Sequence, residues 1–84
     1  MTYSISIKQS AAKTLEKIGR EDRLRIINAI DQIKTNPAAG SVLKGEFSGL
    51  RRIRVGNYRV VYEAQDQRMV VLVIRIGHRR EVYR

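Results

Sequence analysis

The chain has 84 residues, enough for one domain (residues 1–84) with a single small core. It contains no cysteine and one histidine, which excludes disulfide bonds, a cysteine-based zinc site and a histidine-rich metal site. Lysine and arginine number 17 against 8 acidic residues, and this net charge of +9 favours a polyanionic partner over simple solubility. Such a partner would be nucleic acid, an acidic protein or an anionic membrane surface.

The first element is predicted to be a half-buried strand, because residues 2–8 alternate between apolar and polar side chains. Ser10 is a candidate N-cap for a short helix from Ala11 to about Ile18. Gly19 then stands where a glycine commonly ends a helix.

A second helix is predicted from about Glu21 to the Asn36-Pro37 step, since the residue before proline is driven out of helical geometry. Its aliphatic residues recur at helical spacing and are expected to face the core. These residues are Leu24, Ile26, Ile27, Ile30 and Ile33.

A β-hairpin is predicted around Gly56-Asn57, which joins two runs of alternating residues. A two-residue turn there sets Arg54 opposite Arg59 and puts Arg52 on the same face. Like charges placed directly opposite each other destabilise a sheet. We therefore expect this face to hold an anion.

The run at residues 69–76 is apolar at both its odd and its even positions, so it is predicted to be an interior strand. This pattern does not determine which face of the sheet Arg75 occupies. The element order is β-α-α-β-β-β. It predicts an α+β fold in which two helices from the N-terminal half pack on one face of a small, mostly antiparallel, four-stranded sheet. The arginines then line the other, uncovered face.

Six residues suit phosphodiester chemistry on RNA: Arg52, Arg54, Arg59, His78, Arg79 and Tyr83. Cleavage by the neighbouring 2′-hydroxyl needs a base, an acid and cations that stabilise the charge on the phosphorane. Arginine supplies charge but stays protonated, which leaves His78 and Tyr83 as the local proton carriers. A binding patch without catalysis explains the same cluster equally well.

The chain resembles the RelE/ParE superfamily of toxins from toxin–antitoxin systems, and within it the RelE branch. The resemblance rests on Leu43-Lys44-Gly45, on residues 50–62 and on residues 76–83. It implies a toxin that enters the ribosomal A site and cleaves the mRNA there without a metal or another cofactor. It also implies a cognate antitoxin, acidic by complementarity, through which alone the toxin reaches operator DNA.

Carried over residue by residue, the resemblance gives Arg52 and Arg54 stabilisation of the phosphate or a part in proton transfer, and gives Arg59 a contact with the scissile phosphate. It places the family's tail arginine at Arg79, and gives Tyr83 base stacking and assistance to proton transfer. The best-known members have lysines at the positions of Arg52 and Arg54, so the general base is open, and our hypothesis gives proton transfer to His78. Candidate RNA-binding residues are Lys44, Arg51, Arg75 and Arg80.

Two alternatives remain open: a ParE-like inhibitor of DNA gyrase, and a basic module that binds RNA or protein without chemistry.

The N-terminus lacks the basic and apolar stretches of a signal peptide. The longest apolar run, residues 69–74, is too short to span a membrane. The expected compartment is therefore the cytoplasm.

Overall fold

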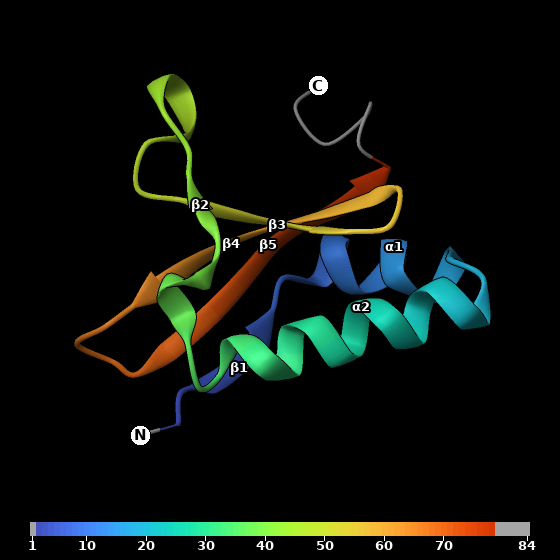
Figure 1. Ribbon diagram of the computed structural model, residues 1–84, viewed down its shortest axis with the longest axis horizontal. Helices are drawn as coiled ribbons and strands as arrows, with labels where there is room; N and C mark the ends of the chain where they lie inside the picture. The colour runs from blue at the N-terminus through green and yellow to red at the C-terminus, as the bar shows by residue number, and fades with distance from the viewer. Residues whose placement is uncertain (1, 79–84) are drawn as a thin grey trace.

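Five strands form one mixed sheet in the computed structural model, which describes residues 2–78 (Figure 1). The strands lie in the order β1-β5-β4-β3-β2. Their bounds are Ser4–Ile7 (β1), Ser41–Val42 (β2), Arg51–Val55 (β3), Tyr58–Gln65 (β4) and Val70–His78 (β5). The predicted four strands are all present, and the two-residue β2 is the one that the sequence pattern missed.

Strand β5 lies inside the sheet, between β1 and β4, as its apolar sequence predicts. It runs parallel to β1 and antiparallel to β4, to which the short turn at residues 66–69 joins it. Val71, Val73 and Ile76 are buried against the helices, whereas Leu72 on the opposite face is only half-buried. Strand β5 is therefore fully buried on the helix side and only half-buried on the opposite side.

Helix α1 spans Gln9–Lys17 and begins earlier than predicted. Lys8 occupies its N-cap position without a side-chain hydrogen bond, and Ser10 lies inside the first turn, where its carbonyl accepts a hydrogen bond from Thr14 Oγ1 at 3.1 Å. Ile18 ends the helix in extended geometry, which directs its side chain into the core. Gly19 has an ordinary φ of −55° and precedes the next helix, so it is not a left-handed stop.

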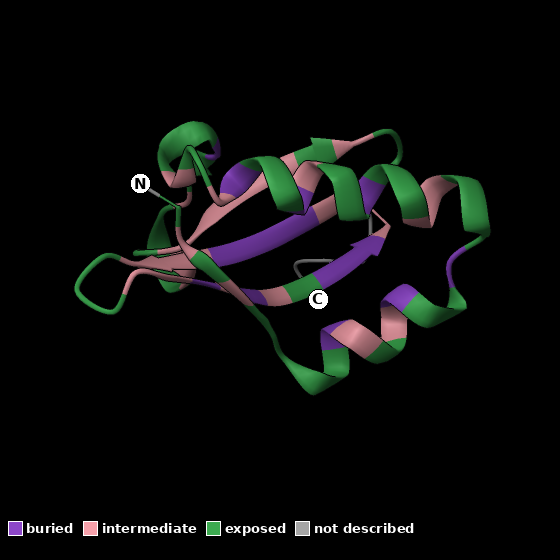
Figure 2. Ribbon diagram, turned by 90° about the horizontal axis from the view of Figure 1, so that it is seen from below, coloured by how far each residue is buried: buried purple, intermediate pink, exposed green. Residues whose placement is uncertain are grey.

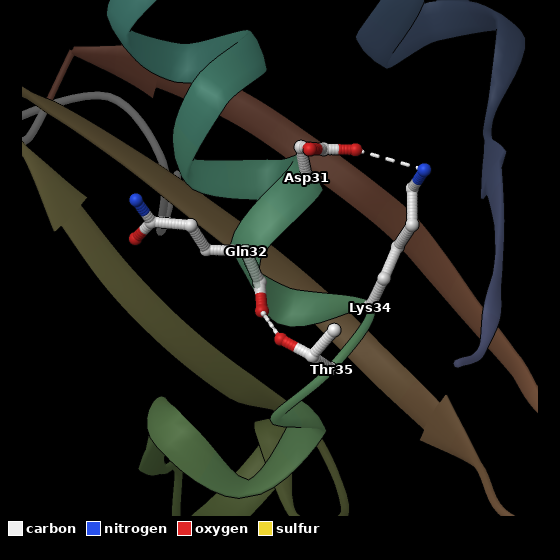
Figure 3. A network of polar contacts seen from close by, with 4 residues as sticks. All are labelled: Asp31, Gln32, Lys34 and Thr35. Carbon is white, nitrogen blue, oxygen red and sulfur yellow. Dashed lines mark hydrogen bonds and ion pairs between the residues drawn. The ribbon is translucent and has the colours of Figure 1, made fainter. Parts of the chain in front are cut away.

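Helix α2 spans Arg20–Ile33 and ends before the predicted Asn36-Pro37 step. The chain tightens there into shorter turns, in which the N–H groups of residues 34 to 36 bond to carbonyls three residues back. Thr35 Oγ1 donates to the Gln32 carbonyl at 3.0 Å, and Lys34 forms an ion pair with Asp31 at 2.8 Å. Both contacts are drawn in Figure 3. These hydrogen bonds satisfy the last carbonyl groups of the helix before the chain reaches Pro37.

Both helices cover the same face of the sheet (Figure 2). Ile26, Ile30 and Ile33 of α2 are buried against the sheet, as predicted. Leu24 and Ile27 are not: they are 49% and 44% exposed. The five aliphatic residues extend over more of the helix surface than the sheet can cover, so part of the predicted core face lies in solvent.

Candidate functional site

The predicted hairpin has the predicted register. Val55 pairs with Tyr58, Arg54 with Arg59 and Ile53 with Val60. Gly56 has a φ of 59°, the left-handed geometry that a two-residue turn favours at its first position.

Four arginines share the face of the sheet that the helices leave uncovered. The register continues from β4 to β5, with Arg59 opposite Gly77 and Val61 opposite Arg75. Directly paired residues lie on one face, so Arg75 joins the arginines of the hairpin. We call Arg52, Arg54, Arg59 and Arg75 the arginine face.

Val61 lies at the centre of the arginine face, with Arg52 opposite it on β3 and Arg75 opposite it on β5. It is 3% exposed and does not belong to the core beneath the helices. Arg54 and Arg75 are exposed, whereas Arg52 and Arg59 are half-buried. This gathering of cations on one rigid surface gives a positive potential that attracts a polyanion.

The arginine face is polarised along the strands. Glu63 lies two residues beyond Val61 on the same face, opposite Leu72, and accepts a hydrogen bond from Gln65 Nε2 at 2.6 Å. The positive charge is therefore concentrated toward the hairpin turn. A small cavity of about 90 Å³ lies at that end and is lined by Arg54, Gly56, Tyr58 and Arg59.

Arg51, a predicted RNA-binding residue, lies away from the arginine face. It pairs with the buried Tyr62, on the helix side of the sheet. Its Nη1 donates to the carbonyl oxygens of Gly40 at 2.9 Å and Ala38 at 3.3 Å. Lys44 is exposed in the loop segment that follows β2, outside the sheet.

His78 is also separated from the arginines. It pairs with Tyr58, and the two rings meet edge to face with centroids 6.0 Å apart. Tyr58 packs against the core beneath the helices, so the His78 ring lies on that side of the sheet. The predicted site residues Arg79, Arg80 and Tyr83 lie outside the described residues.

A second surface was missed by the sequence analysis. Ile7, Leu24 and Ile27 are large apolar residues that are 36%, 49% and 44% exposed. Ile7 and Ile27 border a groove of about 400 Å³ between β1 and α2, whose apolar lining is completed by Ile5 and Ile30. This surface could have been predicted from the sequence, because α2 has more aliphatic residues than one buried face of a helix can hold.

Residues 2–78 contain no group of three or more histidine, cysteine or acidic residues placed to hold a metal ion. Neither helix in this part of the chain has the length and apolar character needed to cross a membrane.

The chain is thus a small basic α+β domain with both helices on one face of the sheet and four arginines on the other. A family model described as the ParE toxin of the type II toxin–antitoxin system parDE matches residues 5–83. The chain belongs to this family, the RelE/ParE toxins.

Comparison with individual proteins points to the RelE side of the family. Toxin RelE of Mycobacterium tuberculosis is 30% identical over 84 residues, which cover 98% of this chain and 87% of that protein. Toxin RelG of the same organism is 27% identical over 86 residues, covering 100% of this chain and 99% of RelG. A structure of the toxin–antitoxin complex RelBE2 from M. tuberculosis gives a TM-score of 0.86 at 25% identity, over 94% of this chain and 100% of that chain.

Proposed function

We propose that this toxin is a ribosome-dependent endoribonuclease that cleaves mRNA in the A site by attack of a 2′-hydroxyl on the adjacent phosphodiester. The observation that carries the proposal is the register of the sheet, which gathers Arg52, Arg54, Arg59 and Arg75 around Val61. Guanidinium groups at fixed positions stabilise the charge that develops on the phosphorane oxygens. They are also planar donors that match phosphate geometry.

Charge stabilisation is the role that we assign to the arginine face, because arginine stays protonated and cannot act as the base. The strands described in residues 2–78 bring no histidine or lysine to this face. The proton-transfer step is therefore assigned to the C-terminal tail. Tyr83 is the candidate proton carrier, and Arg79 is a further phosphate contact.

We further propose that a cognate acidic antitoxin neutralises the toxin and docks in the apolar groove between β1 and α2. The net charge of +9 disfavours self-association and favours an acidic partner. The groove offers such a partner Ile5, Ile7, Ile27 and Ile30 as apolar anchors. The RelBE2 structure is itself a toxin–antitoxin complex. Contact with operator DNA would come only through the antitoxin, and the toxin would act in the cytoplasm, where ribosomes translate mRNA.

A second candidate function is inhibition of DNA gyrase. It is favoured by one observation, the match of residues 5–83 to a family model named for ParE. A gyrase inhibitor needs no nuclease site, so the four arginines would then form a docking surface.

Induction of the toxin in cells separates these functions. A ribosome-dependent nuclease arrests translation, and primer extension shows cuts at codon-related positions in translated messages only. A gyrase inhibitor causes DNA breaks while messages stay intact, and a binding module does neither. Arg59→Ala removes a guanidinium from the arginine face, whereas Arg25→Ala, at an exposed position on α2, is the matched control. Loss of cutting with Arg59→Ala alone supports the nuclease, and equal cutting by both variants overturns this use of the arginine face.

A further inference from the structure

We propose that Tyr62 and Arg51 act together as positioning residues for Arg52, by clasping the loop that carries β2 onto the edge of β3. The proposal rests on the proposed nuclease function and deepens it. It assigns a role to two residues that lie on the opposite side of the sheet from the arginine face.

The Tyr62 hydroxyl is the first half of the clasp. The side chain is fully buried, at 0% exposure. Its hydroxyl donates to the Pro37 carbonyl at 2.6 Å and accepts from the Gly40 backbone N–H at 3.0 Å. One phenol therefore fixes both ends of the turn at residues 37–40, which begins with a single 3₁₀ turn and has no other regular structure.

Arg51 supplies the second half. Its Nη1 donates to the Gly40 carbonyl at 2.9 Å and the Ala38 carbonyl at 3.3 Å. Both backbone polar groups of Gly40 are thus held by side chains, the N–H by Tyr62 and the C=O by Arg51. A charged donor makes a stronger hydrogen bond to a carbonyl than a neutral one does.

Gly40 transmits this restraint to Arg52. A Cβ at Gly40 would lie 2.6 Å from the Tyr62 hydroxyl and 2.9 Å from the backbone oxygen of Arg52, so the loop is wedged between them. The next residue, Ser41 of β2, pairs with Arg52 of β3, and the Leu43 N–H then donates to the Leu50 carbonyl at 3.0 Å. The clasp therefore sets where β2 joins the sheet.

The consequence is that Arg52 and Arg54 are supported differently. The backbone of Arg52 pairs on one side with Ser41 of β2 and on the other with Val61 of β4, whereas Arg54 pairs only with Arg59 of β4. A residue of an active site stabilises a transition state only when the surrounding structure holds it in the productive position. The clasp makes Arg52 the fixed cation of the arginine face.

The test is a double-mutant cycle measured as single-turnover cleavage of ribosome-bound mRNA. Tyr62→Phe removes the hydroxyl while keeping the ring. The matched control is Tyr3→Phe. The Tyr3 hydroxyl donates to Asp66 at 2.7 Å, and Tyr3 immediately precedes β1, at the opposite edge of the sheet from β2. Each variant is combined with Arg52→Ala and, separately, with Arg75→Ala.

Tyr62→Phe is expected to lower the maximal rate about tenfold with KM within about twofold, while Tyr3→Phe changes neither. In the Arg52→Ala background Tyr62→Phe should have no further effect, and in the Arg75→Ala background it should keep its about tenfold effect. An equal additional loss in both backgrounds would show a general structural role and overturn the proposal.

A second measurement does not depend on nuclease activity. Amide hydrogen exchange of the toxin should become faster at Gly40, Ser41 and Arg52 in Tyr62→Phe and stay unchanged at Val55. If the unsubstituted toxin cuts no mRNA, the proposed function fails while this experiment still tests the clasp. Unchanged exchange at Gly40 and Arg52 would overturn the clasp even in an active nuclease.

Discussion

Arg54 and Arg59 face each other directly across the β3–β4 hairpin, on a sheet face that also carries Arg52 and Arg75. Like charges placed directly opposite each other weaken a hairpin, so this pair is expected to destabilise the fold. A local conflict of this kind is expected at functional sites, where stability is sacrificed for an electrostatic task.

Arg54→Thr should therefore change stability and activity in opposite directions. Removing one charge of the pair and adding a β-branched residue is expected to stabilise the protein by about 0.5 kcal/mol. The same change should lower mRNA cleavage by at least about tenfold, because it deletes an exposed cation of the arginine face. Urea unfolding and a cleavage assay measure the two effects. A variant that is both less stable and fully active would contradict the assignment of Arg54.

The alkaline limit of stability should depend on Tyr62. Burial raises the pKa of the Tyr62 hydroxyl above its ordinary value of 10.0, although the Gly40 N–H and the Arg51 charge partly oppose the shift. The unfolded chain then loses this proton at a lower pH than the folded one. The contribution of Tyr62 is thus fully present below pH 10.0 and is lost as pH rises through the folded-state pKa.

Urea unfolding at a series of pH values from about 8 to about 12 checks this dependence. Tyr62→Phe should be less stable than the parent at pH 8 by about 2 kcal/mol, since Gly40 N–H loses its buried partner. The difference should shrink as the pH rises above 10.0. A difference that is constant with pH would mean that Tyr62 ionises as freely in the folded protein as in the unfolded chain.

Neutralisation by the antitoxin should depend on Ile27, which is 44% exposed and borders the apolar groove. Ile27→Glu puts a carboxylate among apolar anchors and opposite an acidic partner, so we expect antitoxin affinity to fall at least about 100-fold. Toxicity should be retained, because the arginine face is on the other side of the sheet. Calorimetric titration with the cognate antitoxin measures the affinity.

Val42→Glu is the matched control, because Val42 is 59% exposed on β2, outside the groove. It should bind the antitoxin as the parent does. If Ile27→Glu also bound normally, the groove would not be the docking site.

His78→Ala should leave the cleavage rate within about threefold and its pH profile unchanged. The reason is the register, which pairs His78 with Tyr58 on the helix side of the sheet. The hypothesis drawn from sequence alone gave His78 a part in proton transfer. A large loss of cleavage rate together with a changed pH profile in His78→Ala would support that hypothesis instead.

The hairpin was predictable because its information is local. Gly56-Asn57 fixes the turn, and alternation on both sides fixes which arginines share a face. The face of Arg75 was not predictable, because β5 is apolar on both parities and its register with β4 shifts between Val61 and Tyr62. A register shift of this kind is a tertiary feature with no signal in the β5 sequence.

The remaining differences have the same origin. Strand β2 has only two residues, too few for an alternating pattern to predict it from the sequence. Arg51 was taken for an RNA-binding residue because of its residue type, yet its partners are loop carbonyls that only the folded chain brings close. In α2, the pattern identified the helix but could not say which of its aliphatic residues the sheet would cover.

We propose that the toxin cuts ribosome-bound mRNA and that the arginine face stabilises the charge that develops in this reaction. The most direct measurement is the single-turnover cleavage rate of mRNA in the A site of purified ribosomes, for the parent toxin and for Arg59→Ala. We predict a cut within the A-site codon that needs the 2′-hydroxyl of the preceding nucleotide and slows by at least about 100-fold in Arg59→Ala. Intact mRNA with the parent toxin, or equal rates for the folded parent and Arg59→Ala, would contradict the claim.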